Sequence, residues 1–159
     1  MATSRTILIT GASSGIGAGI ARALAGPGAR LVLGARRVDR LETLAQDLRG
    51  QGADVLVHPL DVTRRDQVDG FADAARQRFG QVDVIVNNAG VMPLSPMAAL
   101  KVDQWDWMID VNIRGVLHGI AAVLPEMVAR GSGQIINIAS IGALSVVPTA
   151  AVYCATRSE

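Results

Sequence analysis

A glycine-rich turn follows directly on an apolar run near the start of the chain. Residues 7–9 read Ile-Leu-Ile, and residues 10–17 read Thr-Gly-Ala-Ser-Ser-Gly-Ile-Gly. Backbone N–H groups approach a diphosphate closely only where no Cβ stands in the way, a condition that glycine meets. Apolar residues at helical spacing after Gly17 predict that the turn opens a helix whose positive N-terminal end faces the phosphates. The motif indicates a nucleotide cradle, and a glycine-rich turn that binds nothing is its alternative interpretation.

Apolar runs of strand length alternate with amphipathic stretches along the whole chain. Strands are expected near 5–10, 29–34, 53–59, 82–87 and 134–139, and helices near 15–25, 38–49, 65–79 and 103–130. Right-handed crossovers then predict one Rossmann-like α/β domain over residues 1–159, an open parallel sheet of order 3-2-1-4-5 with helices on both faces. Half of the residues are hydrophobic and 3% are aromatic, a balance typical of a buried parallel sheet.

Three local features refine the expected helices. Thr63 is a suitable N-cap for the third helix, and Pro125 is expected to kink the fourth helix, or to end and restart it. A further helix is expected to begin near Ala150, and the sequence stops at Glu159 within that element.

Charge and cysteine content limit the classes of partner. The net charge of +1 gives no electrostatic support for a nucleic-acid or anionic-membrane partner. The uncharged stretch 133–152 is long enough for a membrane span, but polar residues interrupt it, which favours a buried strand and a loop. The lone Cys154 forms no internal disulfide, and the apolar run before Thr10 is too short for a signal peptide. We expect a cytoplasmic protein without a metal cluster.

Four further segments extend the first motif into a pattern. The run Asn87-Asn88-Ala89-Gly90 follows the fourth expected strand, Asn112 lies in the fourth helix, Ser140 ends the fifth strand, and Tyr153 comes thirteen residues later. Together with the glycine-rich turn, this order resembles the short-chain dehydrogenase/reductase family of NAD(P)-dependent oxidoreductases, over all 159 residues. Either Ser140 or Tyr153 alone would more often be structural than catalytic. Their occurrence in the same order as the other motifs of the family reverses that expectation.

The resemblance implies a role for each matching residue. The pyrophosphate would lie against Gly11, Ser13, Ser14, Gly15, Ile16 and Gly17, the adenine ring against Asp61 and Val62, and the adenine ribose beside Asn88, Ala89 and Gly90. Ser140 would donate to the substrate carbonyl oxygen, Tyr153 would act as general acid or base, and Asn112 would hold a water of the proton relay. Asp61 as a helix cap and the asparagines as turn residues are the alternatives. His58 and His118 match no catalytic spacing and are interpreted as structural.

The end of the second expected strand bears on the choice of dinucleotide. NAD-preferring members of the family place an acidic residue there, where it pairs with the ribose 2′-OH. This chain has Ala35 followed by Arg36 and Arg37. The planar fork of Arg36 matches a 2′-phosphate, so NADP(H) is favoured over NAD(H). The alternative is that these arginines only form the solvated start of a helix.

The chain departs from the family pattern in two respects. The family has a lysine four residues after the tyrosine, whereas this chain has Arg157, which shares a helical face with Tyr153 but fits ribose hydroxyls less well. Family members also continue beyond this helix with further strands and a substrate lid, so the resemblance implies a C-terminally incomplete member.

The sequence predicts an NADP-dependent oxidoreductase that transfers a hydride between the nicotinamide and a small alcohol or carbonyl substrate. Apolar residues in the helix 103–130 exceed what one sheet-facing side needs, so a homo-oligomer formed through this helix and the helix from Ala150 is expected. A catalytically silent dinucleotide-binding module stays open as the alternative, since Arg157 replaces the lysine.

Overall fold

The computed structural model describes residues 4–145 and 147–158. Its sheet has five parallel strands: β1 (Thr6–Thr10), β2 (Arg30–Ala35), β3 (Asp54–Pro59), β4 (Val84–Asn87) and β5 (Gln134–Asn137). Their order, β3-β2-β1-β4-β5, confirms the predicted topology. In register, Leu8 of β1 lies between Val32 of β2 and Ile85 of β4.

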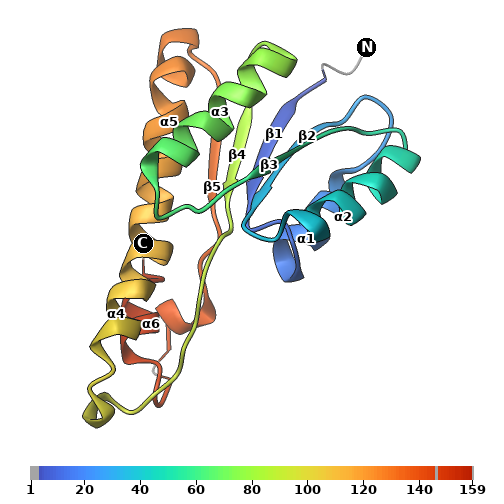
Figure 1. Cartoon of the computed structure of the whole chain (residues 1–159). Coiled ribbons are helices and arrows are strands. Elements are labelled where there is room, and N and C mark those ends of the chain that lie inside the picture. The colour runs from blue at the N-terminus through green and yellow to red at the C-terminus, as the bar shows by residue number, and fades with distance from the viewer. Residues whose placement is uncertain (1–3, 146, 159) are drawn as a thin grey trace.

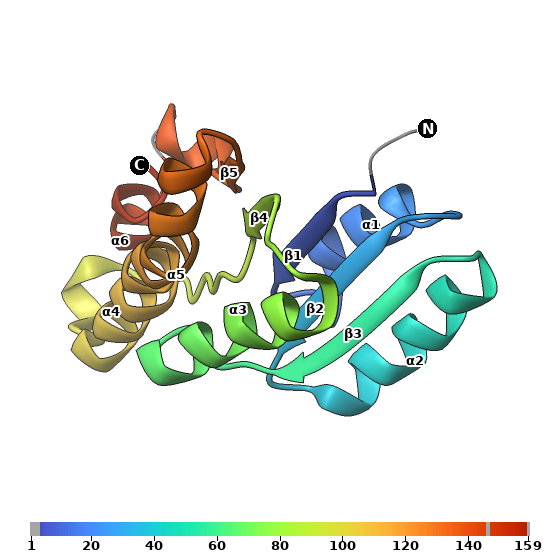
Figure 2. The ribbon, with the colours of Figure 1, turned by 90° about the horizontal axis from the view of Figure 1, so that it is seen from above.

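Helices cover both faces of this sheet. They are α1 (Gly15–Leu24), α2 (Val38–Gly50), α3 (Arg65–Phe79), α4 (Val102–Ile109), α5 (Gly115–Arg130) and α6 (Ala151–Ala155), with the short turns η1 (Met97–Ala99), η2 (Asp110–Arg114) and η3 (Ile141–Ala143). Figure 1 shows α1 and α2 on one side of the sheet and α3 and α5 on the other, and Figure 2 shows the strands in order between them.

Alternating side chains of the strands build a separate apolar core on each face, because successive Cβ atoms of a strand point to opposite sides. Ile9 and Leu33 belong to the core under α1 and α2. Leu8 and Val32 belong to the core under α3 and α5, together with the buried Phe71. The strands therefore bury both faces, as the unbroken apolar runs of the sequence predict.

The residue that begins the third helix differs from the prediction. Helix α3 starts at Arg65 and has Arg64 at its N-cap, without a side-chain capping bond. Thr63 instead donates its N–H (3.0 Å) and its hydroxyl (2.8 Å) to Asp61 Oδ1. The predicted Thr63 cap is therefore wrong, because an Asx turn at Asp61 engages the hydroxyl before the helix begins.

The fourth predicted helix is divided at a different place from the one expected. Pro125 lies inside α5, which runs on to Arg130, so the expectation that the proline ends and restarts the helix is wrong. The irregularity is η2, a π-helical turn in which the Gly115 N–H donates to the carbonyl five residues back, at Asp110. Such turns insert a residue into a helix and rotate the faces that follow.

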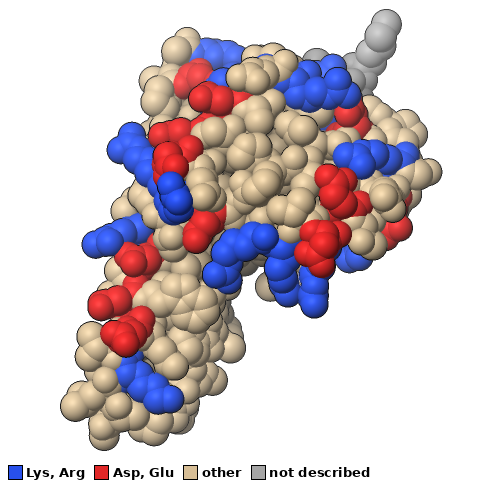
Figure 3. All heavy atoms as spheres, viewed as in Figure 1, with Lys and Arg blue, Asp and Glu red and all other residues tan. Residues whose placement is uncertain are grey.

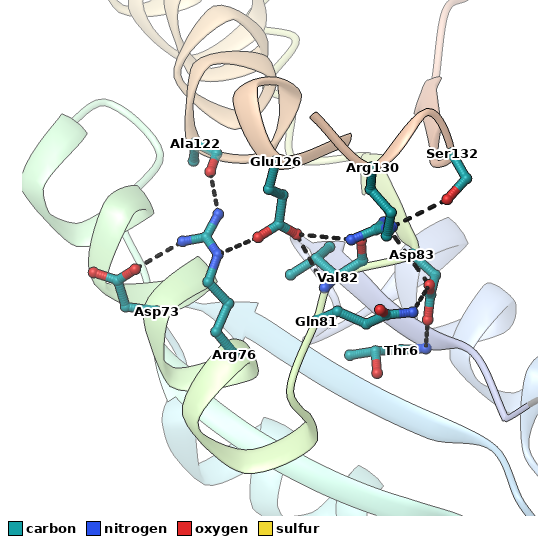
Figure 4. A network of polar contacts seen from close by, with 10 residues as sticks. All are labelled: Thr6, Asp73, Arg76, Gln81, Val82, Asp83, Ala122, Glu126, Arg130 and Ser132. Carbon is teal, nitrogen blue, oxygen red and sulfur yellow. Dashed lines mark hydrogen bonds and ion pairs between the residues drawn. The ribbon is translucent and has the colours of Figure 1, made fainter. Parts of the chain in front are cut away.

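A polar network joins α5, in the turns around Pro125, to α3 and to the segment before β4 (Figure 4). Proline removes one helix hydrogen bond, and next to that position Arg76 of α3 donates Nη2 to the Ala122 carbonyl and Nε to Glu126. Glu126 also accepts from the Val82 N–H (3.1 Å), and Arg130 donates to the Val82 carbonyl (2.8 Å). The network fastens α5 to α3 and to the segment that leads into β4.

The stretch Val102–Arg130 is long and apolar enough, by length and composition, to cross a membrane. Val111, Val123 and Met127 of this stretch belong to the core under α3 and α5. A helix that covers a buried sheet has the same length and composition, so this property follows from the fold.

Candidate active site

A cleft of about 350 Å³ lies at the carboxyl ends of the strands. This is where ligands bind in open α/β sheets of this type. Loops after all five strands contribute to its lining: Gly11, Ser13, Ser14, Ile16, Ala35, Arg36, Arg37, Leu60, Asp61, Val62, Asn88, Ala89, Gly90, Val91, Val111, Ile138, Ala139, Tyr153 and Arg157. Most residues that the sequence singles out thus meet in one hollow, while Gly15, Gly17, Asn112 and Ser140 lie outside its lining.

The glycine-rich turn is shaped by close backbone approach. A Cβ on Gly11 would lie 2.8 Å from Ala89 Cα, and Gly11 has a φ of +67°. A Cβ on Gly17 would lie 2.5 Å from Asn88 Nδ2. Gly15 meets no neighbour but has a φ of +56°, a conformation that favours glycine. These glycines let the turn and the start of α1 sit against the end of β4, leaving the outer face of the turn to the cleft.

Thr10 and Asn88 connect the two strand ends that carry the cradle. The buried Thr10 hydroxyl accepts from the backbone N–H groups of Asn88 and Ala89, both at 3.0 Å. Asn88 Nδ2 donates to the carbonyls of Thr10 (2.9 Å) and Gly11 (3.3 Å). Sequence reasoning missed Thr10, although its position directly before Gly11 and beside a neighbouring strand could have indicated it.

The two arginines after β2 lie at the rim of the cleft and differ in their contacts. Arg37 donates Nη2 to Ser13 Oγ (3.0 Å) and to Ser14 Oγ (2.7 Å), joining the end of β2 to the glycine-rich turn. Arg36 lines the same end of the cleft, and Ala35 contributes no carboxylate there. The result is a rim of guanidinium and hydroxyl donors, which suits a phosphate group.

Asp61, which the resemblance assigns to the adenine ring, forms a turn. Its Oδ1 is taken by Thr63, as described above, and its N–H donates to Gln67 Oε1 (2.8 Å). Because α3 begins only at Arg65, Asp61 does not cap that helix. Asp61 and Val62 both line the cleft.

Ser140 and Tyr153 approach each other around Gly142. A Cβ on Gly142 would lie 3.4 Å from Ser140 Oγ and 3.6 Å from Tyr153 Cε1. The strand β5 ends at Asn137, earlier than expected, and Ser140 instead caps η3, where its hydroxyl accepts from the Gly142 N–H (3.1 Å). The capping contact holds the Ser140 hydroxyl on the Tyr153 side of the loop.

Arg157 is buried beside Tyr153, with 8% of its surface exposed. Its Nη1 donates to the Ile138 carbonyl (3.0 Å), and its guanidinium carbon lies 5.9 Å from the centre of the Tyr153 ring. Among the described residues, its Nε finds no hydrogen-bond partner. A Cβ on Gly90 would overlap Nη2, so the guanidinium rests directly on the Gly90 backbone.

Asn112 is fully buried in the π-helical turn η2. Its amide brackets the Val91 backbone, accepting from the N–H (2.9 Å) and donating to the carbonyl (3.0 Å). Its Nδ2 also donates to Thr156 Oγ1 (2.9 Å), and the Thr156 hydroxyl donates to the Tyr153 carbonyl (2.8 Å). The Asn112 side chain thus connects the loop after β4 to the Tyr153 helix through Thr156. No local sequence signal predicts this contact.

The donors of the cleft suit a phosphorylated dinucleotide. Gly11, Ser13 and Ser14 of the turn line the cleft together with Arg36 and Arg37, which brings hydroxyl and guanidinium donors into one lining. Among the residues that the structure describes, no three His, Cys, Asp or Glu side chains gather as a metal site.

Comparisons with known proteins agree with this arrangement. The family model for short chain dehydrogenases matches residues 5–158. An oxidoreductase of Listeria monocytogenes is 49% identical over 154 residues, which are 97% of this chain and 62% of the relative. A glycine betaine reductase of Emericella nidulans is 43% identical over 98% of this chain and 12% of its own length. The chain spans about three fifths of the Listeria relative and of a similar Staphylococcus saprophyticus oxidoreductase.

Solved structures share the fold at high similarity. An alcohol dehydrogenase from the archaeon Thermococcus sibiricus, in complex with 5-hydroxy-NADP, is 39% identical with a TM-score of 0.91, over 97% of this chain and 66% of that one. A gluconate 5-dehydrogenase from Burkholderia cenocepacia, in complex with NADP and tartrate, is 40% identical with a TM-score of 0.87, over 97% and 60%. The chain belongs to the short-chain dehydrogenase family, whose members are oxidoreductases.

Proposed function

We propose that the protein is an NADP(H)-dependent oxidoreductase that interconverts a small alcohol and its carbonyl compound. The observation that carries the cofactor preference is the contact of Arg37 with Ser13 and Ser14 at a rim without a carboxylate at position 35. Two similar structures hold NADP or a derivative of it, which supports the same choice.

Each part of the cleft would act on a different part of the cofactor. The turn around Gly11 would face the pyrophosphate, Arg36 and Arg37 the 2′-phosphate, and Asp61 the adenine. When bound, the nicotinamide supplies or accepts the hydride.

The remaining chemistry is a proton transfer at the substrate oxygen. In reduction, Tyr153 would donate its hydroxyl proton to the carbonyl oxygen, while the Ser140 hydroxyl stabilises the negative charge that develops there. In oxidation, Tyr153 would take the proton back. Arg157 places its guanidinium carbon 5.9 Å from the centre of the Tyr153 ring, beside the proton donor.

The test is a fluorescence titration of the same preparation with NADPH and NADH. We expect tighter binding of NADPH, and we expect the NADPH-to-NADH affinity ratio to fall about tenfold to a hundredfold in Arg37→Ala, since a charge-assisted hydrogen bond contributes about 1.5–3 kcal/mol. Arg40→Ala is the matched control, because Arg40 is an exposed arginine of α2 outside the cleft lining. Equal affinities of the unmodified protein for both dinucleotides would overturn the NADP(H) assignment.

A dinucleotide-binding module without catalysis is the second candidate function. It is favoured by Arg157, which holds the Ile138 carbonyl and packs on Gly90 at the position of the family's lysine. Unchanged NADPH binding without turnover against a broad panel of aldehydes and ketones, in a chain extended to the length of its relatives, would support this candidate.

We also propose that the protein works in the cytoplasm as a homo-oligomer. The lone cysteine supports a reducing compartment. Exposed apolar side chains on α5 support self-association, which is tested below.

A further inference from the structure

We propose that His118 is a positioning residue that holds the loop Leu60–Thr63 for recognition of the adenine ring. This inference rests on the proposed dinucleotide function, because it assigns Asp61 to the adenine. The spacing of His118 in the sequence matches no catalytic pattern and gives no indication of a role at the site.

The contact itself joins α5 to the cleft lining. His118 Nδ1 lies 2.9 Å from the carbonyl oxygen of Val62, fifty-six residues away in sequence. A carbonyl oxygen only accepts, so Nδ1 carries the proton and donates it. Val62 is buried and lines the cleft beside Asp61, so the histidine acts on the loop from behind.

Gly115 allows α5 to come close enough for this bond. A Cβ on Gly115 would lie 2.7 Å from Val62 Cγ2, so any larger residue would push the helix away from the loop. His118 follows three residues later on the same helical face. Helix α5 therefore contacts Val62 at two points: Gly115 packs against the Val62 side chain, and His118 donates to the Val62 carbonyl.

The other polar groups of the loop are held from different directions. The Leu60 N–H donates to the Ala35 carbonyl (3.0 Å), and the Asp61 N–H donates to Gln67 of α3 (2.8 Å). Asp61 Oδ1 is fixed by Thr63. The His118 bond holds the carbonyl of the Val62–Thr63 peptide, and the N–H of the same peptide donates to Asp61 Oδ1. Loss of the His118 bond would free this peptide and let the Asp61 carboxylate turn from its place in the cleft.

The test compares NADPH with reduced nicotinamide hypoxanthine dinucleotide phosphate, which lacks the adenine amino group that a carboxylate accepts from. We expect the unmodified protein to prefer NADPH and His118→Leu to lose about threefold to tenfold of that preference, as expected for one hydrogen bond. We expect His118→Asn to keep the preference, because the asparagine Nδ2 can replace the Nδ1 donor. Amide hydrogen exchange without ligand should be faster at residues 60–63 in His118→Leu only.

His58→Leu is the matched control. The Nδ1 of His58 also contacts a carbonyl, but that carbonyl is exposed and belongs to the adjacent residue Pro59. This variant should change neither the base preference nor exchange in the loop. An equal loss of affinity for both dinucleotides in His118→Leu, or unchanged loop exchange, would overturn the positioning role. Failure of the unmodified protein to bind either dinucleotide would overturn the proposed function, and the inference with it.

Discussion

Gly90 and Arg157 share one space at the bottom of the cleft. The guanidinium Nη2 lies where a side chain at position 90 would begin, so it would overlap an added Cβ. Gly90→Ala should therefore destabilise the protein by about 1–3 kcal/mol, as overpacking of a filled site does. In the Arg157→Lys background the cost should fall by about half or more, because lysine lacks the branched end of the guanidinium. Urea unfolding of the four proteins measures both values.

Gly70→Ala provides the control for this residue-scale prediction. Gly70 lies within α3, and a Cβ there meets nothing within 4 Å. Alanine should stabilise that helix by about 0.5–1 kcal/mol, since it costs less backbone entropy than glycine. A Gly90→Ala penalty that is the same in the unmodified protein and in the Arg157→Lys background would contradict the shared space.

At the scale of elements, Glu126 joins α5 to α3 and to the start of β4. It pairs with Arg76 and Arg130 and accepts from the Val82 N–H. Burial acts to lower the pKa of Arg76, but its hydrogen bonds to Glu126 and Asp73 outweigh burial and raise that pKa, so the guanidinium stays charged. Glu126→Gln should lower the free energy of unfolding by about 1–3 kcal/mol, because a half-buried charge loses its partner.

The exposed pair of Glu42 and Arg49, at 3.6 Å, supplies the control for Glu126. Glu42→Gln should change stability by less than about 1 kcal/mol, as exposed ion pairs do. Both variants are compared by urea unfolding at matched pH and salt. Equal small effects would mean that the network in Figure 4 contributes no more than a surface pair.

The strands were the predictable part of the fold. Neighbouring strand residues such as Leu8 and Ile9 belong to the cores on opposite faces of the sheet, so both must be apolar and the strand is a continuous apolar run in the sequence. The π-helical turn at Asp110–Arg114 was not predictable, because it shares composition with an ordinary helix. Of the two outcomes expected at Pro125, a kink or an end and restart of the helix, the second is wrong, because α5 continues to Arg130.

Within the site, a motif residue was predictable where its backbone conformation or close approach requires glycine, as at Gly11. Thr10 and Thr156 act through side-chain bonds to other loops, which only the assembled sheet brings near. The assignment of Arg36 to the 2′-phosphate stays a prediction: Arg36 lines the cleft, and the neighbouring Arg37 contacts the serines of the glycine-rich turn. The sequence cannot distinguish two adjacent arginines, because the backbone conformation at the start of α2 determines which of their side chains reaches the turn.

At the scale of the whole molecule, α5 presents an apolar outer face formed by Leu117, Leu124 and Val128. Leu117 is 56% exposed and Val128 is 69% exposed, while the opposite side of the helix packs on the sheet. Figure 3 shows that the lower end of the molecule, where α4 and α6 lie in Figure 1, carries charged side chains mainly along one edge. Exposed apolar side chains that share one face of a helix favour an interface.

We expect self-association through this outer face of α5. Leu117→Glu should shift the protein toward the monomer in sedimentation velocity at micromolar concentration, because a charge would be buried at the interface. Leu24→Glu, on an exposed part of α1, should leave the distribution unchanged. A monomeric unmodified protein under the same conditions would contradict the expectation.

Binding and turnover should separate in the 159-residue chain. The residues that we assign to the pyrophosphate, the 2′-phosphate and the adenine line the described cleft, but the chain spans only 62% of the length of its Listeria relative. Hydride transfer needs a closed and oriented site, and loss of orientation alone costs orders of magnitude in rate. We therefore expect measurable NADPH binding by fluorescence with little or no carbonyl reduction.

The decisive experiment varies chain length and residue 157 together. In the 159-residue chain, Arg157→Lys should restore almost no turnover, because residue 157 cannot replace missing walls of the site. In a chimera that continues with the remaining residues of the Listeria relative, the same substitution should raise NADPH oxidation at least about tenfold, because the compact ammonium fits ribose hydroxyls better than a guanidinium. NADPH absorbance is followed against aldehydes and ketones for all four proteins. Robust turnover by the unmodified 159-residue chain, abolished by Tyr153→Phe, would show that the described cleft already contains everything the reaction needs.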